Sequence, residues 1–198
     1  MLRETECSVK LTYRWEDDLK VRNMSIISLT TDFGDLYPAV MKAVILGINP
    51  GVQIVDVTHS IRQAGIREGA FALYSLVPYF PAKTVHIGVV DPGVGTSRRA
   101  LAIKAGKSGQ EQFFVGPDNG LLIPAARRLG EMEIYEITNR EIMLKSGISA
   151  TFHGRDIFAP AGAYLSRNIQ IDKVQYFTNW IEKSFSFIPI SKYFSLNV

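Results

Sequence analysis

Residues Val89–Arg99 read V-V-D-P-G-V-G-T-S-R-R and lead from a strand pattern straight into a loop pattern. The β-branched run over 84–90 is typical of a buried strand, and it ends at Asp91, which a Pro- and Gly-rich segment follows. In open α/β sheets, ligands bind at the carboxyl ends of the strands, where this acid would lie. Arg98 is close enough along the loop to fold back onto Asp91. The motif alone fits a binding loop, or a β-turn with a structural Asp–Arg pair.

On both sides of this stretch the sequence alternates between short strands and helices. Strands are predicted over 26–30, 52–58, 84–90, 100–105, 112–115 and 133–137, and helices over 39–47, 66–79, 121–129 and 157–165. This alternation predicts an α/β domain, with helix layers on both faces (α/β/α) of a mainly parallel sheet. We predict Asp156 as the N-cap of the last helix, so that His153 lies just before a helix N-terminus.

Polar side chains gather in four places at predicted strand or loop ends. These groups are Asp32/Asp35, Asp56/His59, Asp91/Arg98 and His153/Arg155/Asp156. Because the carboxyl ends of parallel strands meet at one edge of a sheet, we expect the four groups to converge there. His59 also fits a capping or loop histidine with no chemical role.

Length and composition restrict the class of protein. A chain of 198 residues with 46% hydrophobic residues can bury a sizeable core, and its net charge of +3 comes from scattered basic residues, which predicts no nucleic-acid partner. One cysteine and three histidines offer no disulfide and no zinc-ligand spacing, so we expect no metal site. With no signal-peptide pattern and no apolar run of about 18 residues, we expect a soluble, cytoplasmic protein without a membrane partner.

The two ends of the chain differ in character from the middle. Residues 1–23 carry ten charged residues, five of each sign, and are predicted to be a leader outside the core. Residues 24–165 form the predicted α/β domain. Residues 166–198 are rich in aromatic side chains without a clear helix or strand period, and we leave them unassigned.

The chain resembles the S-adenosyl-L-methionine (SAM) hydrolases, also called SAM hydroxide adenosyltransferases, over about residues 24–166. The resemblance rests on five segments in order: L-T-T-D-F-G, D-V-T-H-S-I, V-V-D-P-G-V-G-T-S-R-R, G-P-D-N-G-L-L and T-F-H-G-R-D-I-F-A-P. It implies a cofactor-independent enzyme that converts SAM and water to adenosine and L-methionine, and that assembles as a homotrimer. Related enzymes make 5′-fluoro- and 5′-chloro-5′-deoxyadenosine.

The resemblance also implies roles for individual residues. The catalytic residues would be Asp91, Arg98 and His153, and the substrate-binding residues Asp32, Asp35, Phe152 and Gly154. Of the two binding acids, Asp32 would hold the ribose and Asp35 would lie near the methionine end. Fluorinating relatives carry tyrosine in place of Asp91 and serine in place of Gly154, so both positions favour water over halide. Gly154 alone leaves chloride open, because chlorinating relatives also carry glycine there.

Family members continue into a second, β-rich domain, and nothing in 166–198 matches it. The sequence therefore predicts that the C-terminal β-barrel is absent, through truncation or a shifted frame after Leu165. Besides hydrolysis, this leaves a non-catalytic remnant of the family and a chloride-using SAM halogenase as alternatives. A metal-dependent hydrolase would use Asp32, Asp56, His59 and His153. A Rossmann dinucleotide site is not expected, because no G-x-G-x-x-G follows any predicted strand.

Overall fold

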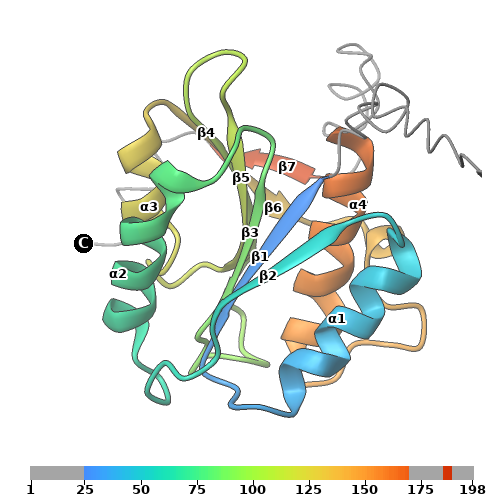
Figure 1. Cartoon of the computed structure of the whole chain (residues 1–198). Helices are drawn as coiled ribbons and strands as arrows, with labels where there is room; N and C mark the ends of the chain where they lie inside the picture. The colour runs from blue at the N-terminus through green and yellow to red at the C-terminus, as the bar shows by residue number, and fades with distance from the viewer. Residues whose placement is uncertain (1–24, 170–184, 189–198) are drawn as a thin grey trace, which may run out of the picture.

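The computed structural model describes residues 25–169 and 185–188 (Figure 1). The predicted leader over 1–23 and most of the predicted tail lie outside the described residues. No helix in the described ranges is both long and apolar enough to cross a membrane.

The described strands form one seven-stranded sheet in the order β2-β1-β3-β5-β4-β6-β7. The strands are β1 Ile26–Thr31, β2 Gln53–Thr58, β3 Val85–Val89, β4 Ala100–Ala105, β5 Gln112–Pro117, β6 Met132–Ile137 and β7 Phe185–Ile188. The pairings among β2, β1, β3 and β5 are parallel, as predicted. The other three pairings are antiparallel. β4 and β5 form a hairpin, β6 pairs with β4 on the outer side of that hairpin, and β7 pairs with β6.

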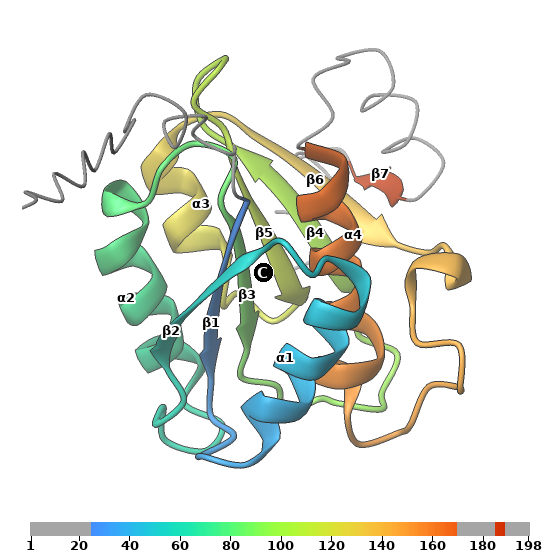
Figure 2. The same cartoon turned by 45° about the vertical axis from the view of Figure 1, so that its right-hand side comes forward.

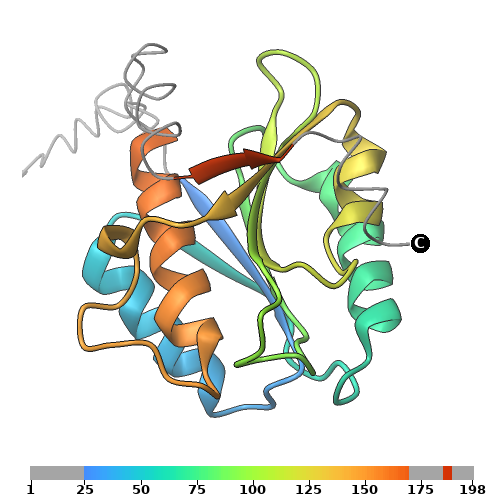
Figure 3. The same cartoon turned by 180° about the vertical axis from the view of Figure 1, so that it is seen from behind.

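Helices cover both faces of this sheet, which confirms the layered α/β/α class. The α-helices within the described residues are α1 Tyr37–Ile48, α2 Ile66–Leu76, α3 Ile123–Leu129 and α4 Ala159–Ile169. Helices α1 and α4 lie on one face and α2 and α3 on the other (Figures 2 and 3). Each face has its own apolar core, one built around Met41, Ile45 and Phe158 and the other around Leu73 and Phe114. Two buried layers fix the sheet rigidly, so the strand ends that carry the polar groups are held in place.

A glycine in α4 sets how closely that helix approaches the sheet. A Cβ on Gly162 would lie 2.6 Å from the side chain of Ile87 in β3. The missing side chain therefore lets α4 rest directly on β3, and this brings the start of the helical segment over the end of the strand.

The last helical segment, predicted over 157–165, begins earlier than the sequence predicts. A π-helical turn, η3 (Gly154–Phe158), precedes α4, and His153 is its N-cap. The prediction of Asp156 as an N-cap is wrong, because Asp156 lies inside this turn. Pro160 has no N–H to donate to the carbonyl of Asp156, which accepts a hydrogen bond from Leu144 N (2.8 Å) instead. The predicted helix over 66–79 is likewise divided, since α2 ends at Leu76 and a 3₁₀ turn, η1 (Val77–Tyr79), follows.

Candidate active site

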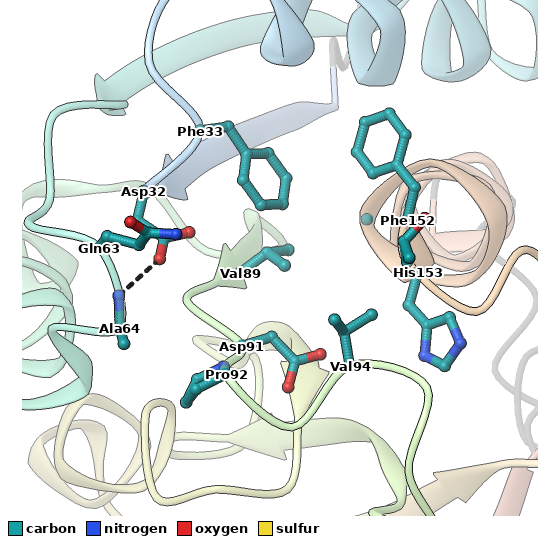
Figure 4. Close-up of a pocket in the computed structure, with 12 residues that line it drawn as sticks. Asp32, Phe33, Gln63, Ala64, Val89, Asp91, Pro92, Val94, Phe152 and His153 are labelled. Carbon is teal, nitrogen blue, oxygen red and sulfur yellow. Dashed lines mark hydrogen bonds between the residues drawn. The ribbon is translucent and has the colours of Figure 1, made fainter.

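A pocket of about 560 Å³ lies where β1 and β3 end, facing the start of η3. Figure 4 shows Asp32, Gln63 and Ala64 on one side, and Phe152 and His153 on the other. The full lining is Asp32, Phe33, Gln63, Ala64, Val89, Asp91, Pro92, Val94, Thr151, Phe152, His153 and Gly154. Its size suits a small organic ligand, and its polar groups are few and convergent, as in most ligand sites.

Hydrogen bonds join Asp91, Arg98 and His153 into one unit at the pocket. Arg98 Nε donates to both Asp91 carboxylate oxygens, at 3.0 Å (Oδ1) and 2.9 Å (Oδ2), and Arg98 Nη2 donates to Asp91 Oδ2 as well. Arg98 Nη2 also donates to Nδ1 of His153, at 2.8 Å. The Asp91 and Arg98 side chains are only 4% and 11% exposed. The structure thus brings together three residues far apart in the sequence, as the sequence predicts.

The contact with Arg98 fixes the protonation state of His153. A guanidinium can only donate, so Nδ1 of His153 must accept and carries no proton. Burial, followed by the positive charge of Arg98, lowers the pKa of His153 below its usual value, although Asp91, Asp156 and a backbone hydrogen bond to Ser149 oppose this. The imidazole is therefore neutral near pH 7.

A glycine sets the distance between the two loops that carry these residues. Gly95 has a φ of +79°, which favours glycine, and a Cβ there would overlap the carbonyl oxygen of Ala150. The loop after β3 therefore packs directly on the loop before His153. This close approach lets the Arg98 guanidinium reach across to the imidazole.

The buried carboxylate of Asp156 holds the loop before His153. Asp156 is 0% exposed, and its Oδ2 accepts from Ser149 N at 2.7 Å, while Oδ1 accepts from Arg155 Nε at 2.6 Å. The sequence predicts Asp156 as a helix N-cap, but its carboxylate accepts a hydrogen bond from a backbone N–H of the preceding loop instead.

Asp32 lies on the wall opposite His153, and two aromatic rings, those of Phe33 and Phe152, also line the pocket. Asp32 Oδ2 accepts a hydrogen bond from Ala64 N at 2.9 Å. The Phe33 and Phe152 rings meet edge to face, with centroids 5.6 Å apart. A Cβ on Gly154 would lie 2.9 Å from the Phe33 ring, so glycine at this position leaves room for that ring.

Five of the seven residues predicted for the site line the pocket: Asp32, Asp91, Phe152, His153 and Gly154. Arg98 lies behind Asp91, and Asp35 is exposed and does not line the pocket. The other seven lining residues were not predicted: Phe33, Gln63, Ala64, Val89, Pro92, Val94 and Thr151. Ala64 contributes its backbone N–H, which no side-chain pattern reveals, whereas Val94 and Thr151 stand inside the quoted motifs.

The four residues of the metal-dependent alternative do not share one place. Asp32 and His153 line the pocket, while Asp56 and His59 pair with each other outside it, with Oδ1 and Nε2 3.0 Å apart. Among the described residues, no three His, Cys, Asp or Glu side chains are grouped so that they could hold a metal ion.

The fold and this site define a family. The family model described as "SAM hydroxide adenosyltransferase N-terminal domain" matches residues 27–175, and the chain belongs to this family. It is 49% identical over 143 residues to an (R)-S-adenosyl-L-methionine hydrolase of Salinispora tropica, covering 71% of this chain and 52% of that protein. It is 41% identical over 151 residues to the enzyme of the same name from Methanocaldococcus jannaschii, covering 73% of this chain and 54% of the relative.

The chain is also similar to a more distant relative and to a solved structure. A fluorinase of an Actinoplanes species is 30% identical over 170 residues, covering 75% of this chain and 57% of that enzyme. The crystal structure of an uncharacterized conserved protein from Thermotoga maritima has a TM-score of 0.67 at 46% identity, covering 71% of this chain and 54% of that one. The chain spans about half the length of the curated relatives it matches.

Proposed function

We propose that this chain hydrolyses SAM to adenosine and L-methionine, with water attacking C5′ of the ribose. The observation that carries the proposal is the hydrogen-bonded unit of Asp91, Arg98 and His153 at a pocket of ligand size. The names of the relatives at 38–49% identity support the same substrate and reaction.

The reaction needs help mainly on the side of the nucleophile. Attack forms the C5′–O bond and breaks the C5′–S bond, and the bonding pair moves to sulfur, which loses its positive charge. One proton leaves the attacking water. Free water has a pKa of about 15.7, so it attacks poorly until a neighbouring group takes this proton. The site must therefore supply a base beside the water and hold C5′ in line with it.

The geometry favours Asp91 as that base. Asp91 and His153 line the pocket, whereas Arg98 does not. The Nε and Nη2 of Arg98 donate to these two side chains, and its Nη1 donates to the Arg99 carbonyl (3.3 Å). In this proposal Asp91 accepts the proton of the water. Arg98 orients the carboxylate and the imidazole together, and His153, neutral and fixed at Nδ1, positions the water from the other side.

Asp32 is the proposed ribose contact. The hydrogen bond from Ala64 N fixes one of its carboxylate oxygens before any ligand binds. A carboxylate oriented in advance can hold vicinal ribose hydroxyls without first losing rotational freedom, and such positioning contributes several kcal/mol in oriented reactions, up to about 7–11 kcal/mol. Phe152 and Gly154 stay proposed as substrate contacts, because both line the pocket. Asp35 stays a prediction from resemblance alone.

The test is product identification with purified protein, SAM, and either chloride or a chloride-free buffer. We expect adenosine and methionine in equal amounts under both conditions. Asp91→Asn should lower kcat more than tenfold, and Asp32→Ala should mainly raise KM. Arg99→Lys is the matched control, because Arg99 lies on the same loop as Asp91 and does not line the pocket. Its side chain pairs instead with Asp118 after β5 (Nε to Oδ2, 2.8 Å).

Three results would overturn the proposal. Adenosine release by Asp91→Asn at the wild-type rate would remove its base. A 5′-chloro nucleoside would make the chain a halogenase. Absence of SAM binding by calorimetry would support a non-catalytic remnant. The homotrimer, the cytoplasmic location and the division into 1–23, 24–165 and 166–198 remain predictions, and light scattering would test the first.

A further inference from the structure

A second line of paired polar side chains runs beside the pocket, from α1 to the end of β1. Lys42 Nζ lies 2.5 Å from Asp56 Oδ2, and Asp56 Oδ1 lies 3.0 Å from His59 Nε2. On the other side of the ring, His59 Nδ1 lies 2.9 Å from Thr31 Oγ1. Four side chains from α1, β2, the loop after β2 and β1 thus form one connected line ending at Thr31.

The surroundings of this line assign the hydrogen positions. Thr31 Oγ1 accepts from the Phe33 backbone N–H at 3.3 Å, so its own proton is free to be donated to Nδ1 of His59. The ring proton then lies on Nε2, which is 3.0 Å from Asp56 Oδ1 in an electrostatic contact that is not aligned as a hydrogen bond. Partial burial acts to raise the pKa of Asp56, but the hydrogen bond from Lys42 and the nearby His59 ring hold it below its usual value, so Asp56 is the charged partner of both groups.

The order carboxylate, imidazole, hydroxyl is also that of a nucleophilic triad, but this one cannot reach a substrate. Thr31 is 0% exposed and does not line the pocket. A hydroxyl enclosed in the core has no access to a reacting carbon. The line must therefore act through the backbone that it holds.

That backbone is the segment carrying Asp32. His59 holds it at two points, since its side chain bonds Thr31 just before Asp32 and its carbonyl oxygen accepts from Gly34 N at 3.0 Å just after it. Ala64, which fixes the Asp32 carboxylate, belongs to the same loop as His59. The two loops are thus locked to each other by three contacts around one acid.

We propose that His59 is a positioning residue for Asp32, and that the chain binds SAM through an Asp32 whose place in the pocket His59 sets. This inference rests on the proposed function. It assigns no chemical step to His59. Loss of the His59 side chain should weaken the binding of SAM that Asp32 provides, and the rate of attack on C5′ should stay nearly unchanged.

The test combines three variants with steady-state kinetics. His59→Ala should raise KM for SAM about tenfold, the size expected for one lost hydrogen bond, with kcat within about twofold. His59→Asn places an amide oxygen near the position of Nδ1 and should recover most of the KM. Ser60→Ala is the matched control, because Ser60 is an exposed neighbour in the same loop and its side chain does not line the pocket.

A double-mutant cycle and amide exchange complete the test. Adding His59→Ala to Asp32→Ala should raise KM no further, because the group being positioned is already gone. Amide hydrogen exchange at Phe33 and Gly34, measured without SAM, should accelerate in His59→Ala and not in Ser60→Ala.

Additive effects in the cycle, or unchanged exchange at both amides, would overturn the proposal. The exchange measurement needs no substrate. If the wild-type chain does not bind SAM, the proposed function is wrong. Amide hydrogen exchange at Phe33 and Gly34 still decides whether His59 holds the Asp32 segment.

Discussion

Replacing Arg98 with alanine should destabilise the fold and abolish turnover at the same time. The change leaves the Asp91 carboxylate, 4% exposed, without the guanidinium that donates to both its oxygens. Removing one partner of a buried ion pair typically costs about 3–5 kcal/mol, because the other charge stays buried and unpaired. His153 also loses the donor at its Nδ1. We therefore expect the free energy of unfolding to fall by about 3–5 kcal/mol.

The neighbouring arginine provides the control for this prediction. Arg99 is 24% exposed and pairs with Asp118, which is 7% exposed, so Arg99→Ala also leaves a nearly buried carboxylate unpaired. Urea unfolding should show a large loss in both variants, but turnover should collapse only in Arg98→Ala. Adding Asp91→Asn to Arg98→Ala should restore part of the stability, because the unpaired charge is gone. A loss below about 1 kcal/mol in Arg98→Ala, or equal loss of turnover in both variants, would contradict this role of Arg98.

Three further predictions concern the glycine that joins the loops and two histidines. Gly95→Ala should lower kcat more than tenfold, because the new Cβ would overlap the Ala150 carbonyl. Gly109→Ala is the control, since Gly109 has a similar φ of +80° but a Cβ there would have no atom within 4 Å, and turnover should not change. Equal effects of the two substitutions would contradict this prediction. Burial lowers the pKa of His86 from 6.5 to about 4, so the unfolded chain binds this proton at a higher pH than the folded chain does. Urea unfolding should therefore show about 3 kcal/mol of stability lost as pH falls from 6.5 towards 4. An equal loss in His86→Gln would contradict this prediction. Because the pKa of His153 is lowered, the acid limb of kcat/KM should lie below pH 6.5, and a limb above it would argue against a neutral imidazole.

The fold could be predicted from the sequence where burial alone decides it. The apolar runs of β1 and β3 are buried on both faces, as strands central to a layered sheet must be, so their pattern was clear. The direction of β4 and β6 depends on a hairpin and on pairing across the sheet, which local patterns do not contain. The start of the last helical segment was misplaced for a similar reason, since Asp156 bonds to a loop rather than to its own helix.

The candidate site could be predicted as far as strand ends determine it. Asp32 and Asp91 follow parallel neighbours, β1 and β3, so their convergence followed from topology. Asp35 is only three residues further along, but the turn carries it to an exposed position outside the pocket. That Arg98 lies behind Asp91, and that His59 supports the Asp32 segment, depends on contacts between loops distant in sequence.

The claim that water attacks C5′ beside Asp91 and His153 is tested most directly by turnover in ¹⁸O-labelled water. Mass spectrometry of the products distinguishes the bond that forms, because the oxygen from water becomes the 5′-hydroxyl. We predict one ¹⁸O atom in adenosine and none in methionine, with labelled adenosine forming more than tenfold more slowly in Asp91→Asn. Unlabelled adenosine, or a labelled product that forms equally well in Asp91→Asn, would contradict it.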